Sequence, residues 1–362
     1  MLLAAGGTGG HLFPAEALAH ALRARRIEVE LVTDARALRY GGEFPARAMH
    51  TIAAATPRGG SALEKAKAIA LLGVGTLQAL RHLSRMRPLA VVGFGGYPSV
   101  PPLFAASLLR IPTVLHEANA VMGRANAFLA GRVDQIAAGF PLAGVSPALA
   151  GKITVTGNPL RPAALAVATR SYPDLAEGKL RLLVTGGSQG ARVMADIVPP
   201  ALELLPQELR ERIELTQQTR EEDLARVAMS HARAGVVCQL APFFADLPER
   251  IAAAHLVIAR AGASTVTELA VIGRPSILVP LPHALDQDQA ANAAVLAKSG
   301  AAEVVAQKDF TPQWLAARIA DLAAHPELLQ ERAQAARRVG VADAAERLAD
   351  LVLAAALRRN AE

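Results

Sequence analysis

The sequence has little cysteine, few aromatic residues and no long apolar run. Its 362 residues include one cysteine, Cys238, which excludes a disulfide framework and a zinc cluster built from cysteines. Aromatic residues make up 4% of the chain, so we do not expect a stacking surface for nucleic acid. The longest uncharged apolar stretch, Ala68 to Leu80, is shorter than the ~20 residues that span a bilayer. We expect a protein that is soluble or peripheral to a membrane.

Apolar and basic residues are both well represented. At 52% hydrophobic residues and ~150 residues per domain, the chain can form two packed cores. Lys and Arg outnumber Asp and Glu by 38 to 32, a net charge of +6, which indicates a basic surface facing an acidic partner. Phosphates, nucleotides and an anionic membrane surface are the remaining candidate partners.

Leu-rich or β-branched runs alternate with segments of helical spacing, which is typical of a parallel sheet. The expected strands are 2–5, 28–33, 90–93, 113–116, 135–138, 153–156, 180–185, 214–217, 236–240, 256–259, 276–279 and 302–305. In the first half, helices are expected at about 14–25, 62–85, 99–109 and 122–131. The two prolines in Gly157–Pro162 indicate a domain hinge. The sequence therefore predicts an α/β fold with two doubly wound parallel-sheet domains.

The first strand of each half ends in a glycine loop. Leu2–Gly10 and Leu182–Gly190 match at five of nine positions with an offset of 180 residues, which favours an internal duplication over chance similarity. Such loops let a phosphate approach the backbone and a helix N-terminus, although a tight turn is the simpler interpretation. Further glycine loops at Gly93–Tyr97 and Arg260–Ser264 favour phosphate binding. Leu12 replaces the last glycine of a dinucleotide fingerprint and no Walker lysine follows, so NAD binding and ATP hydrolysis are disfavoured.

Several polar residues have both a functional and a structural interpretation. His11, at the mouth of the first loop and ahead of the helix, could accept a proton from a hydroxyl or cap the helix. Glu268 could bind a ribose diol or complete a capping box with Thr265. Asp286 and Asp288 have a spacing found at divalent-metal sites, but capping of the following helix explains them more simply.

Two further segments leave alternatives open. His116, Glu117 and Asn119 follow a strand, either as a polar set facing a cleft or as a turn. The segment 62–85 has an apolar centre and basic ends, a composition that suits a helix on an anionic membrane or an ordinary core-facing helix.

Taken together and in order, the motifs resemble those of the MurG family, the bacterial peptidoglycan N-acetylglucosaminyltransferases. They are Gly6–His11, Gly93–Ser99, His116–Asn119, Gly157–Arg161, Thr185–Arg192 and Gly262–Glu268. The resemblance implies a GT-B fold, in which two Rossmann-like domains face a central cleft. It implies an acceptor- and membrane-binding domain at 1–159, completed by a C-terminal helix at 343–362, and a UDP-GlcNAc-binding domain at 160–342.

The resemblance also implies an activity. It is the inverting transfer of N-acetylglucosamine from UDP-GlcNAc to the 4-hydroxyl of undecaprenyl-diphospho-N-acetylmuramoyl-pentapeptide, without metal or cofactor, on the cytoplasmic face of the cell membrane. His11 corresponds to the base, and the helix at 62–85 to the membrane contact. The implied UDP-GlcNAc ligands are Thr8, Gly9, Gly10, Asn119, Arg161, Ser188, Phe244, Ala263, Ser264, Thr265, Val266, Thr267, Glu268 and Gln289. The implied acceptor side comprises Gly95, Gly96, Tyr97, His116 and Glu117.

Two kinds of function remain as alternatives. Another enzyme of the same fold could act on UDP-sugars, either a lipid glycosyltransferase or a UDP-GlcNAc 2-epimerase. A nucleotide-binding regulator without chemistry would tolerate the loss of His11.

Overall fold

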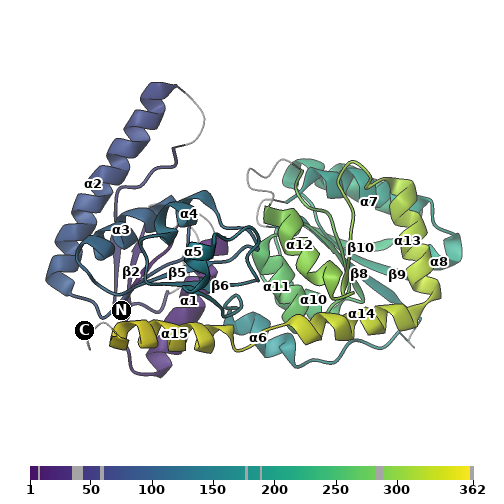
Figure 1. Cartoon of the computed structure of the whole chain (residues 1–362). Coiled ribbons are helices and arrows are strands. Elements are labelled where there is room, and N and C mark those ends of the chain that lie inside the picture. Colours follow the sequence, from purple (N-terminus) through teal and green to yellow (C-terminus); the bar gives the residue numbers. More distant parts are fainter. Residues whose placement is uncertain are drawn as a thin grey trace. The chain divides into compact units, whose positions relative to one another are not determined.

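The computed structural model describes residues 1–6, 9–34, 44–57, 61–175, 178–187, 190–282 and 288–358 (Figure 1). The chain divides into two compact units, one formed by Met1–Arg161 with Ala342–Glu362 and the other by Pro162–Val341. Each unit contains a parallel sheet with helices packed on it, so the predicted α/β fold class is confirmed.

Among the described residues, the first unit has a sheet of seven parallel strands in the order β3-β2-β1-β4-β5-β6-β7. The strands are β1 Leu2–Ala4, β2 Glu30–Thr33, β3 Ala48–Thr51, β4 Val91–Gly93, β5 Thr113–Glu117, β6 Gln135–Ala138 and β7 Ile153–Val155. Strand β3 was not predicted from the sequence. This edge strand has no buried residue and reads Ala-Met-His-Thr, so it lacks the apolar pattern of the buried strands.

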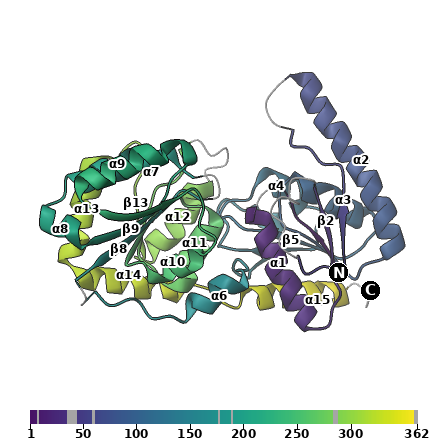
Figure 2. The same ribbon diagram turned by 180° about the vertical axis from the view of Figure 1, so that it is seen from behind.

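Helices cover both faces of this sheet. They are α1 Gly9–Ala24, α2 Ala62–Met86, α3 Val100–Leu108, α4 Arg124–Ala130, α5 Pro147–Ala150 and α15 Ala344–Arg358, with a short 3-10 helix at Tyr97–Ser99. Successive strand residues point to opposite faces, so Leu3 packs with α1 and α15 whereas Leu2 packs with α2, α3 and α4. The C-terminal helix α15 therefore belongs to the core of the first unit, beside α1 (Figure 2).

Helix α1 begins at Gly9, earlier than the predicted start near residue 14. Proline is favoured at the first helical position, where its missing N–H costs nothing. Pro14 instead lies inside the helix, so the missing hydrogen bond is the one that would reach the Gly10 carbonyl. As a consequence His11 lies within the first turns of α1, not ahead of the helix as predicted.

The second unit repeats the strand arrangement of the first. Its described strands run in the order β10-β9-β8-β11-β12-β13, with β8 Leu180–Thr185, β9 Ile213–Gln218, β10 Val237–Ala241, β11 Leu256–Ala259, β12 Ser276–Leu278 and β13 Ala302–Val304. The helices are α6 Pro162–Ala168, α7 Arg192–Glu203, α8 Gln207–Arg212, α9 Leu224–Ala234, α10 Leu247–Ala253, α11 Ala263–Ile272, α12 Asp288–Lys298, α13 Pro312–Ala324 and α14 Pro326–Val339, with a 3-10 helix at Glu221–Asp223.

In both sheets the strand order reverses beside the first strand. β1 lies between β2 and β4, and β8 lies between β9 and β11. In open parallel sheets ligands bind at this reversal, outside the carboxyl ends of the strands. Ligand-binding residues are therefore expected in the loops after β1 and β4 in one unit and after β8 and β11 in the other.

Candidate active site

In the first unit, His11 packs against the glycine turn that follows β4. A Cβ atom at Gly95 would lie 3.3 Å from His11 Cε1, and one at Gly96 would lie 3.4 Å from His11 Nε2. Both glycines also have positive φ angles, +85° and +70°. Any larger residue here would be strained and would press on the imidazole, so the two glycines position the ring of His11. Ser99 fixes the turn, because its hydroxyl donates to the carbonyls of Ala4 and Gly95 at 3.0 and 2.6 Å.

The surroundings of His11 keep its imidazole neutral. Burial lowers the pKa of His11 below its ordinary value, and the Phe94 backbone beside the ring opposes only part of that shift. A neutral imidazole near pH 7 can accept a proton, as a general base must.

The pH dependence of turnover should reflect this lowered pKa. A base works in its unprotonated form, so kcat/KM should stay level from pH 7 down to the ordinary histidine pKa of about 6.5 and fall only below it. A pH–rate profile measures this directly. An acid limb centred above pH 6.5 would show that another group, or an unperturbed histidine, controls the reaction.

His116 and Glu117 lie beneath the surface, 0% and 2% exposed. Burial lowers the pKa of His116 to about 4, against the opposing effect of the Gly157 backbone, and its ring lies 5.4 Å from that of Phe94. The Glu117 carboxylate accepts hydrogen bonds from the backbone of Asn119 and Gly123, each at 2.9 Å, and from Asn126 Nδ2 at 2.7 Å. Burial raises the pKa of Glu117. Its direct role is therefore to hold the loop that carries Asn119, and its place on the acceptor side stays a prediction.

The other residues predicted for this unit have different surroundings. Arg161 stacks on the ring of Phe13, with Cζ 4.1 Å from the ring centroid, so its charge is held beside α1. Both nitrogens of Asn119 donate to Glu117 Oε1, at 2.9 and 3.3 Å. Gly9 is buried and Gly10 is exposed, while Tyr97 is half-buried. Thr8 lies outside the described residues.

In the second unit, Gln218 anchors the glycine loop after β8. Its Oε1 accepts from the Thr185 hydroxyl at 2.9 Å and from Gly186 N at 3.0 Å, and its Nε2 donates to the Gly187 carbonyl at 2.9 Å. Gln218 was not among the residues predicted from the sequence. A polar side chain at the carboxyl end of the neighbouring strand β9 was the signal that could have identified it. Ser188, the predicted diphosphate ligand, lies outside the described residues.

Helix α11 presents an N-terminus without a side-chain cap. Its N-cap is Gly262, which has no side chain to accept from the N–H groups of the first turn, formed by Ala263, Ser264 and Thr265. The predicted capping box is wrong, because Thr265 lies inside the helix. A free helix N-terminus with its positive dipole end is suited to bind an anionic or polar ligand.

The remaining side chains of this turn differ in accessibility. Val266 is fully buried, so only its backbone can meet a ligand. The Thr267 hydroxyl donates to the Ala263 carbonyl at 2.8 Å. Glu268 is 6% exposed, one turn into α11. Its role as ribose ligand stays a prediction.

Gln289 and Asn292, one turn apart on α12, hold the segment just before α11. Gln289 Oε1 accepts from the backbone of Ala261 and Leu281 at 3.3 and 3.1 Å, and Asn292 Nδ2 donates to the Ala261 carbonyl at 3.2 Å. Asp288 is the first described residue of α12, and its Oδ1 accepts from Gln289 N at 2.9 Å; its predicted capping role stays a prediction. Asp286 lies outside the described residues.

Phe244 is buried beneath a guanidinium group. Arg250 Cζ lies 4.2 Å from its ring centroid, and Arg250 is held by Asp246 and Gln239 at 2.8 and 2.6 Å. The side chain of Phe244 thus packs within the unit, and a ligand would meet its backbone.

Comparisons with known proteins identify the family of this chain. Residues 1–138 match the glycosyltransferase family 28 N-terminal domain, and residues 181–348 match the glycosyltransferase family 28 C-terminal domain. The chain is 58% identical over 354 residues, 97% of both chains, to a Rhodopseudomonas palustris protein named UDP-N-acetylglucosamine--N-acetylmuramyl-(pentapeptide) pyrophosphoryl-undecaprenol N-acetylglucosamine transferase. A Methylorubrum populi protein with the same name is 58% identical over 355 residues, 97% of this chain and 96% of its own.

Solved structures show the same relationship. MurG of Acinetobacter baumannii superposes with a TM-score of 0.80 at 31% identity, with 98% of each chain covered. A UDP-GlcNAc 2-epimerase from Neisseria meningitidis superposes with a TM-score of 0.67 at 13% identity over 99% of each chain, which shows a shared fold. The predicted GT-B fold is thereby confirmed.

Proposed function

Because this chain belongs to the MurG family within glycosyltransferase family 28, we propose that it transfers N-acetylglucosamine from UDP-GlcNAc to a lipid-linked MurNAc-pentapeptide. The acceptor is undecaprenyl-diphospho-N-acetylmuramoyl-pentapeptide, and the product is a precursor of peptidoglycan. The observation that carries the mechanism is the neutral His11 held against the glycine turn Gly95–Gly96.

The proposed reaction is a single displacement. His11 takes the proton of the MurNAc 4-hydroxyl while that oxygen attacks the anomeric carbon of GlcNAc, and the bond to UDP breaks with its electron pair on the diphosphate. Backbone N–H groups of the loop after β8 and the uncapped N-terminus of α11 stabilise the charge that develops there. Gln218 and Gln289 hold the backbone at Gly186 and Ala261, next to these groups, so little reorganisation should accompany the reaction.

Individual side chains have proposed roles around this step. Glu268 accepts from the ribose hydroxyls, Ser188 binds the diphosphate and Gln289 Nε2 binds the sugar. Arg161, Asn119 and the residues Thr8 to Gly10 complete the donor site, and Gly95, Gly96 and Tyr97 form the acceptor side.

The assay that tests this function uses UDP-GlcNAc labelled in the sugar, incubated with and without the lipid-linked acceptor. We expect UDP release and lipid-bound label in equal amounts, and neither without acceptor. Conversion of UDP-GlcNAc without acceptor, with N-acetylmannosamine among the products, would instead support the 2-epimerase. Absence of turnover under both conditions would support a regulator.

We also propose that α2 rests on the cytoplasmic face of the membrane, where the lipid acceptor is held. Only small residues and Leu83 of this helix are buried, whereas five of its large apolar side chains are 45% to 68% exposed and Leu72, Leu80 and Met86 are partly buried. These exposed residues are Leu63, Ile69, Leu71, Val74 and Leu77. Lys65, Lys67, Arg81 and Arg85 stand at the two ends, a pattern suited to an anionic lipid surface. No described helix is long and apolar enough to cross a bilayer.

Charge placed on this apolar face should abolish membrane binding without harming the enzyme. We expect the double variant Ile69→Glu, Leu77→Glu to lose co-sedimentation with phosphatidylglycerol vesicles while its activity on a detergent-soluble acceptor stays near wild type. Met229→Glu, at an equally exposed apolar residue of α9, is the matched control. Unchanged vesicle binding by the double variant would remove α2 as the docking surface.

A further inference from the structure

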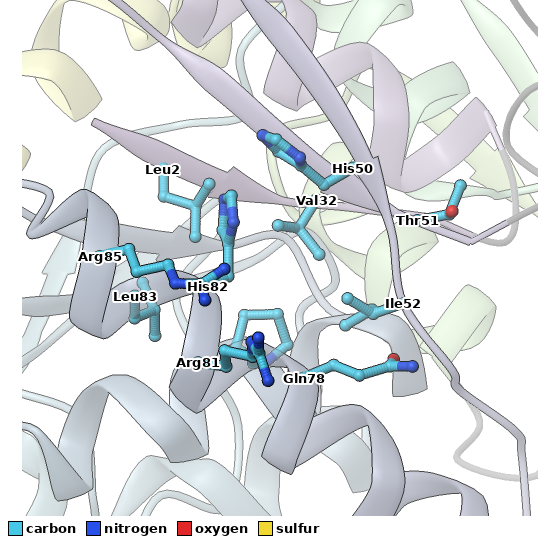
Figure 3. A pocket seen from close by; sticks show the side chains of 12 residues that line it. Leu2, Val32, His50, Thr51, Ile52, Gln78, Arg81, His82, Leu83 and Arg85 are labelled. Atoms are coloured by element: carbon cyan, nitrogen blue, oxygen red, sulfur yellow. The ribbon is translucent and has the colours of Figure 1, made fainter.

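Three potential metal ligands lie close together in the first unit, where α2 packs beside strands β2 and β3. Glu30 of β2, His50 of β3 and His82 of α2 each offer one ligand atom, and these atoms lie within 4.8 Å of one another. His50 Nε2 is 2.7 Å from Glu30 Oε2, and His82 Nε2 is 3.7 Å from the same oxygen. The imidazole centroids are 4.0 Å apart, and Figure 3 shows both rings directed into the same space.

The hydrogen bonding of this cluster is incomplete. His82 Nε2 is buried without a hydrogen-bond partner, since 3.7 Å to Glu30 Oε2 is too long for a hydrogen bond. A buried polar atom without a partner is costly, so its position facing a carboxylate and a second imidazole needs an explanation. One cation between the three atoms supplies the partner that His82 lacks.

We propose that Glu30, His50 and His82 form a zinc site. Two imidazole nitrogens and one carboxylate oxygen are a ligand set that Zn²⁺ uses where one coordination position stays open. Pairwise separations of 2.7 and 3.7 Å bracket the spacing of ligands around a tetrahedral ion with bonds of about 2.0 to 2.1 Å. The third pair, between the ligand nitrogens of His50 and His82, lies within 4.8 Å, so the side chains would close around the ion.

The surroundings support and shape this site. Arg47 Nη2 binds the other Glu30 oxygen at 2.5 Å and fixes the carboxylate as outer-shell partners do, so the ion would replace only the hydrogen bond between His50 Nε2 and Glu30 Oε2. His50 and His82 line a cavity of about 320 Å³ that Arg81 and Arg85 also line (Figure 3). The open coordination position therefore faces a cationic pocket, where the fourth ligand is water or an anionic oxygen.

The ion would tie α2, the helix proposed to rest on the membrane, to two strands of the sheet. It joins the edge strand β3 and its neighbour β2 to the C-terminal half of α2. Because none of the three residues belongs to the proposed active site, metal binding can be measured independently of the transferase reaction.

Isothermal titration of the metal-free full-length protein with ZnCl₂, and with CoCl₂ as a spectroscopic probe, tests the proposal. We expect one ion per chain, a higher Tm with Zn²⁺ and visible absorption typical of tetrahedral Co²⁺ with nitrogen ligands. His50→Gln and His82→Gln should each weaken binding by roughly tenfold or more, since even outer-shell changes have effects of about that size.

Two variants separate ligand loss from general damage. His82→Cys, which supplies another zinc ligand, should restore binding, and His20→Gln, at an exposed histidine of α1, should leave it unchanged. Absence of stoichiometric binding to the wild type would overturn the proposal, as would affinities unaltered in His50→Gln and His82→Gln.

Discussion

Replacement of His11 by alanine should lower kcat for N-acetylglucosamine transfer by roughly 10² to 10⁴-fold, the usual contribution of a general base. The imidazole is the neutral group that packs against Gly95 and Gly96 at the carboxyl end of β4. Without it, the acceptor hydroxyl must lose its proton to water. UDP-GlcNAc affinity should change little, because His11 is not among the proposed donor ligands and most of those ligands lie in the second unit.

Steady-state kinetics with a UDP-release assay, together with calorimetric binding of UDP, measures both effects. His20→Ala is the matched control, since His20 lies on the same helix but is exposed. If His11→Ala keeps most of the wild-type kcat, another group is the base. If it loses UDP binding in proportion to kcat, His11 has a structural role.

Replacement of Arg274 by methionine should destabilise the second unit by about 3 kcal/mol or more, since each buried acceptor left unsatisfied costs about 1 to 3 kcal/mol. Arg274 is fully buried. Its guanidinium donates to the carbonyls of Ala252 at 2.5 Å and Ile272 at 2.8 Å, at the ends of α10 and α11. It also reaches the carbonyls of Gly273 and Ser171, at 2.9 and 3.0 Å.

The charge of Arg274 persists despite its burial. Burial and the nearby Arg337 lower the pKa of Arg274 only to about 10, so near pH 7 it remains a cation at the negative ends of two helices. Methionine keeps much of the side-chain volume but supplies no donor, so the carbonyls lose their partners while packing is largely retained.

Urea unfolding followed by tryptophan fluorescence reports on this unit alone, because the only tryptophan in the sequence, Trp314, lies in α13. Arg233→Met is the control, since Arg233 is exposed and its ion pair with Glu203 is 3.9 Å long. That variant should change stability by no more than about 0.5 kcal/mol. Equal midpoints for the two variants would refute the bridging role of Arg274.

The fold was largely predictable because its signals are local. A buried parallel strand reads as a short apolar run, and the strands around β1 and β8 were predicted to within a few residues. The glycine loops identified the carboxyl ends of the strands, where His11 and the start of α11 lie. The edge strand β3 was missed because partial exposure removes the apolar pattern on which strand prediction depends.

The supporting residues could not be predicted in the same way. Gln218 accepts a hydrogen bond from Thr185, and Arg274 donates one to Ser171, only because segments distant in the sequence pack together. Nothing in the spacing of Glu30, His50 and His82 indicates a common site, since parallel strand pairing and helix packing bring them together. These contacts depend on tertiary structure, which periodicity along the chain does not report.

In the proposed mechanism, transfer occurs in one displacement, with His11 removing the acceptor proton as the diphosphate leaves. A single displacement inverts the anomeric centre of the α-linked donor. The most direct measurement is therefore the anomeric configuration of the transferred sugar, from the proton coupling at its C1 by nuclear magnetic resonance of the product. We expect a β-linked N-acetylglucosamine on the MurNAc 4-oxygen. An α-linked product would contradict a single displacement.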